Sequence, residues 1–296
     1  MDHALLTRRE LLALTAAASA TLLVRGKLKP AMLTRPIPHT GEPLPVIGLG
    51  TWQTFDVADP EPLRPVLARF AERGAKLVDS SPMYGSAEEA VGALATSELF
   101  LATKVWTSGR EAGIAQIGRS MQRMRTQRLD LLQVHNLLDV ETHLRTLRSM
   151  KEAGRIRYIG ITHYSAGAHA RVEEVLQKEP VDFLQINYSL AEPEAAARLL
   201  PLAAEKGVAV IANRPFAEGA LFRAVRGKKV PEWAAEIDCT SWAQLFLKWI
   251  VSHPAVTAAI PATADLRHLD DNLAAGFGRM PDAAMRKRIA DTVRER

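Results

Sequence analysis

Short apolar runs alternate with longer segments of helical periodicity along most of this chain. Runs typical of buried strands cover residues 46–51, 75–79, 99–104, 129–135, 157–162, 181–187, 207–212 and 256–260. Patterns typical of amphipathic helices cover residues 60–73, 87–95, 110–127, 140–153, 166–178, 193–206, 240–252 and 268–275. Because each predicted helix follows a predicted strand, the pattern indicates an α/β protein with a parallel sheet.

The ends of the predicted elements support this assignment. Glycine follows a charged last turn at Gly74, Gly154 and Gly207, which is a common way for a helix to end. Eight strand–helix units favour a closed (β/α)8 TIM barrel over an open doubly wound sheet. Residues 32–36 and 44–47 predict a short N-terminal β-hairpin, and residues 281–296 predict a C-terminal helix with an arginine-rich, solvated face.

An open sheet should carry a glycine fingerprint for a dinucleotide after its first strand. Gly48 and Gly50 begin such a motif, but the third glycine is absent and no helix starts there. We interpret the two glycines as a strand end at which the backbone passes close to a ligand.

Four ionisable residues lie at or just beyond the ends of successive predicted strands: Asp79, Tyr84, Lys104 and His135. In a parallel barrel such strand ends face one cavity. A free phenol has a pKa of about 10, and a neighbouring ammonium favours the phenolate. We therefore expect Lys104 to lower the pKa of Tyr84, Asp79 to hold Lys104, and His135 to orient a substrate oxygen. This set predicts proton delivery to a carbonyl oxygen.

A structural interpretation of the same residues is also open. Asp79 and Lys104 alone would form an ordinary ion pair, Tyr84 would pack, and His135 would be a hydrogen-bonded core imidazole. The convergence of all four residues in strand order favours an active site instead.

Motifs along the chain, taken together, resemble the successive signatures of an aldo-keto reductase. They are Ile47-Gly-Leu-Gly-Thr-Trp52, Val78-Asp-Ser-Ser-Pro-Met-Tyr-Gly85, Ala102-Thr-Lys-Val-Trp106, Leu129-Asp-Leu-Leu-Gln-Val-His135, Arg155-Ile-Arg-Tyr-Ile-Gly-Ile161 and Asp182-Phe-Leu-Gln-Ile-Asn-Tyr188. The resemblance covers about residues 32–275. It implies a (β/α)8 barrel that binds NADPH and passes hydride to an aldehyde or ketone. It also implies that Asp79, Tyr84, Lys104 and His135 form the catalytic tetrad.

The resemblance assigns further residues to the cofactor and the substrate. Those expected to contact the cofactor are Thr51, Thr162, His163, Gln185, Asn213, Arg214, Pro215, Phe216, Thr263, His268, Asp271 and Asn272. Thr162 and Gln185 match positions that hold the nicotinamide carboxamide, and His163 replaces the usual asparagine. Asn213 replaces an aromatic residue that stacks on the nicotinamide, and Arg214 is expected to lie over that ring or to reach the pyrophosphate. Trp52 and Trp106 are expected to line the substrate mouth.

The adenosine segment leaves the choice between two cofactors open. Many relatives place lysine or arginine at the positions of Ala262 and His268, where a 2′-phosphate is bound. Thr263, Arg267 and the N-terminus of the following helix remain as donors. We expect NADPH, with NADH as the alternative.

Composition and charge exclude several classes of function. The 296 residues are 47% hydrophobic and 24% charged, which is ordinary for a folded soluble domain. The net charge is +5, of which residues 1–30 contribute +3. The remaining sequence has no cluster of basic residues interleaved with aromatic residues, so a nucleic-acid partner is not indicated. Cys239 is the only cysteine, which excludes a disulfide within the chain, and we expect it to be buried. A metal-dependent hydrolase barrel typically carries a His-x-His pair on an early strand, and this sequence has no such pair.

The N-terminus resembles a twin-arginine export signal. Arg8 and Arg9 precede an apolar, alanine-rich run at residues 11–24 that is too short to span a bilayer comfortably. We therefore expect residues 1–30 to be a signal and residues 31–296 to be the barrel. The twin-arginine machinery is then a partner, the location is periplasmic with the cytoplasm as the alternative, and the barrel is a monomer acting on a small carbonyl compound.

A second class of function uses the same scaffold without turnover. A nicotinamide-binding sensor or interaction protein would retain the cofactor and react slowly or not at all. His163 and Asn213, which depart from the family pattern, favour that alternative.

Overall fold

The computed structural model describes residues 31–294 of the chain. The described residues from Met32 onward form one compact unit, and everything below concerns the described part of the chain. No helix within that part has the length and apolar character needed to cross a membrane. The predicted signal segment lies outside the described residues.

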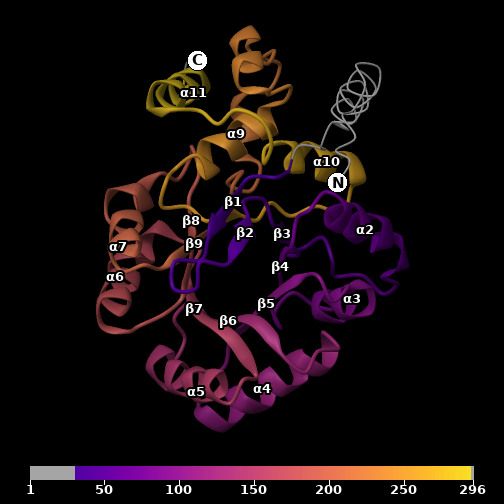
Figure 1. The fold of residues 1–296 in the computed structure, drawn as a ribbon, viewed down its shortest axis with the longest axis vertical. Coiled ribbons are helices and arrows are strands. Elements are labelled where there is room, and N and C mark those ends of the chain that lie inside the picture. The colour runs from indigo at the N-terminus through magenta and orange to yellow at the C-terminus, as the bar shows by residue number, and fades with distance from the viewer. Residues whose placement is uncertain (1–30, 295–296) are drawn as a thin grey trace, which may run out of the picture. The chain divides into compact units, whose positions relative to one another are not determined.

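Within residues 31–294, eight parallel strands pair in chain order around a barrel (Figure 1). They are β3 (Leu49–Gly50), β4 (Leu77–Asp79), β5 (Phe100–Val105), β6 (Leu129–His135), β7 (Ile156–Thr162), β8 (Phe183–Asn187), β9 (Ala209–Asn213) and β10 (Ala258–Ala259). Parallel bridges join Ile47 to Ala259 and Gly50 to Ala262, so the last strand meets the first. The predicted (β/α)8 barrel is confirmed.

Helices surround the strands as the alternating pattern predicts. They are α2 (Arg64–Glu72), α3 (Ala87–Leu94), α4 (Arg110–Arg123), α5 (Val140–Glu152), α6 (His169–Lys178), α7 (Leu199–Glu205), α8 (Ala220–Ala224), α9 (Trp242–Val251), α10 (Leu266–Ala274) and α11 (Ala283–Arg294). The three glycines predicted to end helices all have positive φ, between 66° and 80°. The sequence analysis missed α8 and the 3-10 turn at Glu232–Ile237, because both lie in a long segment without clear periodicity.

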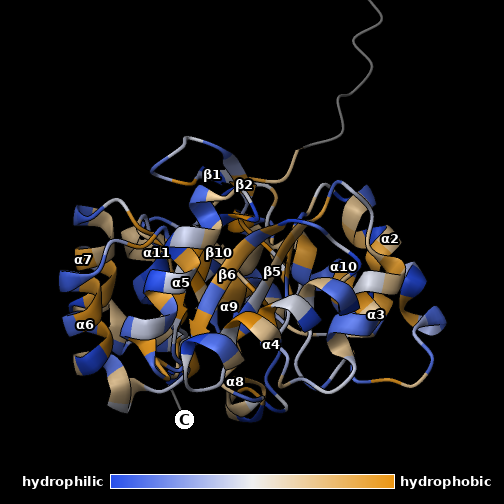
Figure 2. Ribbon diagram, turned by 90° about the horizontal axis from the view of Figure 1, so that it is seen from below, coloured by the Kyte–Doolittle hydropathy of each residue, from blue (hydrophilic) through white to orange (hydrophobic). Residues whose placement is uncertain are grey.

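A short hairpin closes the N-terminal end of the barrel. Its strands β1 (Thr34–Pro36) and β2 (Pro43–Pro45) pair antiparallel, close to the predicted limits. Ile37 and Leu44 are buried in the same cluster as Phe100 and Phe183 of the barrel strands. The hairpin and α8 lie at opposite ends of the barrel (Figure 2). Apolar side chains thus fill the N-terminal end, and a site is expected at the other end.

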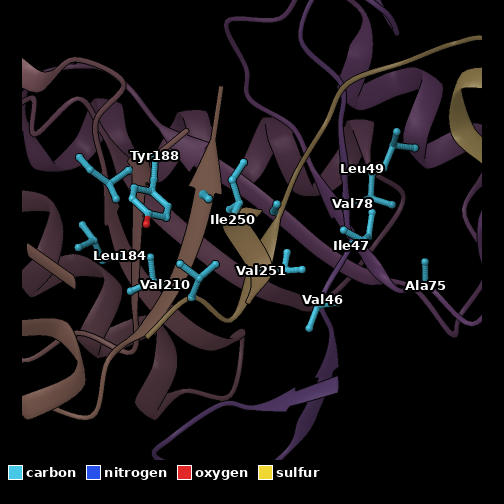
Figure 3. Packing of buried hydrophobic residues seen from close by; sticks show 14 of the residues in the cluster. Val46, Ile47, Leu49, Ala75, Val78, Leu184, Tyr188, Val210, Ile250 and Val251 are labelled. Atoms are coloured by element: carbon cyan, nitrogen blue, oxygen red, sulfur yellow. The ribbon is translucent and has the colours of Figure 1, made fainter. Parts of the chain in front are cut away.

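A second apolar layer lies between the strands and the surrounding helices. Leu184 and Val210 of β8 and β9 belong to it together with Ile250 and Val251 of α9 (Figure 3). Each is less than 1% exposed. Burying a side chain of this size contributes about 1.5–3 kcal/mol to folding, so this layer holds the strand ends in fixed positions. Cys239 is also buried, as predicted.

The two glycines at the first barrel strand, Gly48 and Gly50, have a structural role that the sequence analysis did not identify. A Cβ atom added at Gly48 would lie 2.9 Å from the carbonyl oxygen of Leu77, and one at Gly50 would lie 2.9 Å from that of Ile260. Neighbouring barrel strands therefore exclude larger side chains at both positions. Gly50 also lines the cavity described below, whereas Gly48 does not. A close approach between strands therefore explains Gly48, and a close approach to a ligand stays a prediction for Gly50.

Candidate active site

The four predicted catalytic residues meet at the C-terminal end of the barrel. Asp79 ends β4, Lys104 lies one residue before the end of β5, and His135 ends β6. Lys104 is level with Gln133 in the pairing of β5 with β6, and Tyr84 follows β4 in the next loop. A cavity of about 680 Å³ opens at this end, lined by Asp79, Tyr84 and His135. The prediction that these four residues lie close together at one end of the barrel is confirmed.

Most of the other predicted site residues line the same cavity. Those that do are Thr51, Trp52, Trp106, Thr162, Gln185, Asn213, Arg214, Pro215 and Phe216. The predicted site residues that are not part of the lining are Lys104, His163, Thr263, His268, Asp271 and Asn272. The cavity therefore contains the predicted reaction centre but not the predicted adenosine end.

A buried ion pair lies at the base of the site. Lys104 Nζ donates to Asp79 Oδ2 and to the Ser80 carbonyl oxygen, both at 2.6 Å, and both ionic side chains are almost completely buried. Gln133 and Gln185 donate to Asp79 Oδ1 at 3.0 and 2.9 Å. The pKa of Lys104 is raised, because burial is outweighed by the Asp79 carboxylate and the Tyr84 phenol. Lys104 is therefore charged at neutral pH.

Gln185 takes part in this network, and the cofactor contact expected from the resemblance stays a prediction. Its amide nitrogen donates to Asp79 and to Gln133 Oε1, and its oxygen accepts from Thr162 Oγ1 at 3.2 Å. Its polar atoms are thus already bonded within the barrel. Gln133, which the sequence analysis missed, lies two residues before His135 on β6, and the period of two along a strand places both side chains on the same face.

Tyr84 remains a protonated phenol in this environment. Burial raises its pKa, and the neighbouring ammonium of Lys104 lowers it by less, so the net direction is upward. The Lys104 Nζ atom lies 4.9 Å from the centroid of the Tyr84 ring. The prediction that Lys104 lowers this pKa is confirmed, but desolvation of the phenolate, which the prediction did not include, is the larger effect. A phenol that keeps its proton at neutral pH is suited to act as an acid.

His135 is neutral and oriented toward the same space. Burial lowers its pKa to about 3, with smaller contributions from Lys104 and His163. Its ring centroid is 6.1 Å from that of Tyr84 and 6.1 Å from that of Trp106. A neutral imidazole carries one N–H and one acceptor nitrogen, so its tautomer decides what it can offer a substrate.

Ser81, which the sequence analysis missed, contacts the inner nitrogen of this ring. Its Oγ lies 3.3 Å from His135 Nδ1 and accepts a hydrogen bond from the Met83 N–H. Donation of the Ser81 hydroxyl proton to Nδ1 requires the hydrogen of His135 to be on Nε2, and we expect this tautomer because it leaves an N–H for a substrate oxygen. The signal was present in the sequence, since Ser81 lies between Asp79 and Tyr84.

Replacing Ser81 with alanine should change the tautomer of His135. In the wild-type protein we expect ¹⁵N NMR to report the form protonated at Nε2, and in Ser81→Ala a mixture of both forms. Ser81→Thr, which keeps the hydroxyl, is the matched control and should retain the wild-type pattern. Protonation at Nδ1 in the wild-type protein would contradict this assignment.

His163 and Asn213 depart from their expected roles. The Nδ1 atom of His163 accepts from the N–H groups of Tyr164 and Ser165 at 3.0 and 3.2 Å, which turns this ring onto its own loop and away from the cavity wall. Asn213 Nδ2 donates to the His163 carbonyl oxygen at 3.1 Å. The Asn213 Oδ1 atom is buried without a hydrogen-bond partner. Asn213 thus joins two strand ends and leaves one acceptor at the wall of the cavity.

Arg214 is held by two carboxylates. Its Nε and Nη2 atoms donate to Glu192 at 3.3 and 3.0 Å, and its Nη1 atom donates to Glu218. Its guanidinium also lies 6.0 Å from the centroid of the Tyr164 ring. The sequence analysis expected Arg214 to lie over the nicotinamide or to reach the pyrophosphate. In this structure its guanidinium is instead bonded to Glu192 and Glu218.

The donors expected at the adenosine end are also already bonded. Asp265 caps α10, and its carboxylate accepts from the N–H groups of Arg267 and His268 at 2.8 and 3.2 Å. The Arg267 guanidinium pairs with the same carboxylate. Thr263 Oγ1 bonds the backbone of Asp265. The sequence analysis expected the N-terminus of this helix to donate to a 2′-phosphate and did not identify Asp265 as its cap. In this structure Asp265 accepts from these N–H groups.

The remaining two residues of this segment bond or pack within the protein. Asp271 Oδ1 accepts from Gln244 Nε2 at 2.6 Å, and Asn272 is buried. Asp271 thus links α10 to Gln244 of α9, and Asn272 lies in the interior of the protein.

Comparison with known proteins agrees with this geometry. The sequence profile of the Aldo/keto reductase family matches residues 46–289, which is most of the chain. The chain belongs to the aldo/keto reductase family. It is 28% identical over 242 residues to methylglyoxal reductase YeaE of Escherichia coli (strain K12), with 78% of this chain and 85% of that protein covered. It is 27% identical over 230 residues to aldo-keto reductase YhdN of Bacillus subtilis (strain 168), with 68% and 66% covered.

Solved aldo-keto reductases share the fold. The holo form of AKR11C1 from Bacillus halodurans superposes with a TM-score of 0.74 at 20% identity, covering 89% of this chain and 97% of that one. An aldo/keto reductase from Klebsiella pneumoniae, solved in complex with NADP and acetate, superposes with a TM-score of 0.73 at 24% identity, covering 86% and 93%. These likenesses establish the barrel.

The mouth of this aldo-keto reductase barrel is more apolar than the sequence analysis expected. Trp52 and Trp106 line it as predicted, and Met83, Tyr164 and Phe222 line it as well. Tyr164 lies two residues beyond the end of β7, a position that could have been noticed, whereas Phe222 belongs to the unpredicted α8. Within residues 31–294, no group of three or more His, Cys, Asp or Glu side chains is arranged to hold a metal ion.

Proposed function

We propose that this protein is an NADPH-dependent carbonyl reductase that converts an aldehyde or ketone to an alcohol, with Tyr84 as the general acid. One observation carries the proposal: a charged lysine, buried against Asp79, lies beside a protonated phenol at the base of an apolar cavity. An ammonium beside a protonated phenol at the wall of a cavity is suited to proton delivery to an oxygen.

The residues at the cavity wall fit a nicotinamide cofactor. The unpaired Oδ1 of Asn213 would accept a hydrogen bond from a carboxamide, with Thr162, Pro215 and Phe216 beside it. Thr51 follows β3, and only β10 separates β3 from β9 around the barrel. When bound, the reduced nicotinamide supplies the hydride. We propose NADPH, because the Klebsiella relative was solved with NADP, and NADH remains the alternative.

The chain's own residues deliver the proton. Tyr84 donates its hydroxyl proton to the carbonyl oxygen, and Lys104 stabilises the resulting phenolate through its charge. Asp79 keeps Lys104 charged and fixed. The neutral His135 donates from Nε2 to the same oxygen and orients it. Trp52 and Trp106 exclude water from the reacting atoms.

Replacing Asp265 with serine should favour NADPH over NADH. The resemblance puts a 2′-phosphate beside the first turn of α10, where the Asp265 carboxylate lies; its hydrogen bonds from Arg267 and His268 lower its pKa to about 2. Serine also caps helices, so α10 should persist. We expect the ratio of the two dissociation constants to shift about tenfold toward NADPH, measured by quenching of tryptophan fluorescence. An equal change for both cofactors would show that the adenosine end is elsewhere.

A cofactor-binding sensor without turnover is the second candidate function. It is favoured by Asn213, which offers no aromatic ring at the end of β9, and by His163, whose side chain turns away from the cavity. Oxidation of bound NADPH by a panel of aldehydes and ketones separates the two candidates. Turnover supports the reductase, and tight cofactor binding with no oxidation by any compound supports the sensor.

We further propose that the protein is exported through the twin-arginine machinery to the periplasm and acts there as a monomer. Arg8 and Arg9, which carry this proposal, lie outside the described residues. A variant with both arginines changed to lysine should remain in the cytoplasmic fraction at full length, with a folded barrel. Fractionation identical to that of the wild-type protein would contradict export by this route and favour the cytoplasm.

A further inference from the structure

Large hydrophobic side chains are concentrated at the mouth of the cavity. In the part of the chain that the structure describes, the large hydrophobic residues that are most exposed are Trp52, Met83, Trp106, Tyr164, Phe222 and Leu266, with 37–52% of their surface exposed. All except Leu266 line the cavity. Exposed apolar groups gathered in one place indicate a binding surface. This wall is suited to an aromatic or other bulky apolar group.

The charges at the mouth do not favour an anion. Of the described residues that line the cavity, Arg214 is the only lysine or arginine. It donates through a fork to Glu192 and also to Glu218, and Glu218 is itself part of the lining. Two carboxylates therefore surround one guanidinium, which leaves an excess negative charge at this side of the mouth.

The deeper charged groups provide no compensation. Lys104 is neutralised by Asp79 at 2.6 Å, and His135 is neutral at physiological pH. A carboxylate or phosphate on a substrate would have to displace a carboxylate from Arg214 or lie unpaired beside Glu218. Either arrangement carries a cost that a neutral group avoids.

We infer that the site selects neutral carbonyl compounds that carry an aromatic or bulky apolar group, and discriminates against carbonyl compounds that carry a carboxylate or phosphate. This inference rests on the reductase function proposed above. The apolar wall binds the body of the substrate, and the Glu192–Arg214–Glu218 cluster determines which charge is accepted.

Two ketones with the same ring and the same reacting carbon test the charge preference. Methyl benzoylformate is neutral, whereas benzoylformate is a carboxylate. At saturating NADPH and neutral pH, we expect kcat/KM for the ester to exceed that for the acid by about 30-fold or more. Methyl pyruvate, which lacks the ring, should be reduced about tenfold less efficiently than methyl benzoylformate. Equal values within either pair would overturn the corresponding half of the inference.

Glu218→Gln separates the protein's selectivity from the intrinsic reactivity of the two ketones. Removing this charge should lower the ester-to-acid ratio about fivefold. Glu98→Gln is the matched control, since it removes the same charge from an exposed position outside the cavity lining and should leave the ratio unchanged. An unchanged ratio in Glu218→Gln would overturn the role of the cluster.

A binding measurement distinguishes failure of this inference from failure of the proposed reaction. If neither ketone is reduced, the reductase function fails, and quenching of tryptophan fluorescence by each compound in the presence of NADP⁺ still reports selectivity. Tighter binding of the ester upholds the selectivity of the cavity. Equal or tighter binding of the acid overturns it.

Discussion

Replacing Tyr84 with phenylalanine is expected to lower kcat/KM for carbonyl reduction by about 10²–10⁴-fold. The ring and its packing against His135 remain, so cofactor binding should change little. The physical reason is that the phenol lines the cavity and its ring lies beside the Lys104 charge, which stabilises the phenolate left after proton transfer. Single-turnover oxidation of bound NADPH measures the chemical step directly.

Tyr164→Phe is the matched control for this change. It removes a hydroxyl from a second tyrosine in the lining of the same cavity. We expect its kcat to stay within about threefold of the wild-type value, because its phenol has no ammonium partner. A Tyr84→Phe enzyme that is as active as Tyr164→Phe would remove Tyr84 from the mechanism.

Replacing Lys104 with methionine is expected to impair both activity and stability. Asp79 would remain buried without its cationic partner, which is typically destabilising by about 3–5 kcal/mol. Adding Asp79→Asn to Lys104→Met removes the unpaired charge and should recover part of this loss. Urea unfolding measures the stability, and the double variant should stay inactive because the ammonium that stabilises the phenolate is absent.

A second buried lysine supplies the control for stability alone. Lys248 Nζ donates to the carbonyl oxygens of Ile237 and Arg279 at 2.6 and 2.9 Å, away from the cavity. Lys248→Met should also destabilise the fold but should keep kcat near the wild-type value where it is folded. Loss of kcat in both variants to the same extent would indicate that Lys104 acts only through the fold.

The barrel and the position of its reaction centre could be predicted from the sequence, because both follow from short-range pattern. Apolar runs mark the strands, and Asp79, Lys104 and His135 mark where three of them end. Strand order then brings these ends together without any knowledge of loop conformation. The position of Tyr84 in the site could be predicted because this residue follows Asp79 closely along the chain.

The finer roles could not be predicted, because they depend on competition between hydrogen-bond partners. His163 turns back onto its own loop because two adjacent N–H groups donate to its Nδ1 atom. Asp265 occupies donors that a phosphate would use. The direction of the Tyr84 pKa depended on whether burial or the Lys104 charge was larger, which only the three-dimensional surroundings determine.

The central claim, that this cavity transfers hydride to a carbonyl carbon, is tested most directly by isotope transfer. NADPH with deuterium at both C4 positions of the nicotinamide would be oxidised by methyl benzoylformate in the presence of the enzyme, and the alcohol analysed by mass spectrometry and NMR. We predict one deuterium on the carbinol carbon of the product, formed by the wild-type protein and strongly reduced with Tyr84→Phe. Alcohol without deuterium at that carbon, or no alcohol from any carbonyl compound despite bound NADPH, would contradict the proposed function.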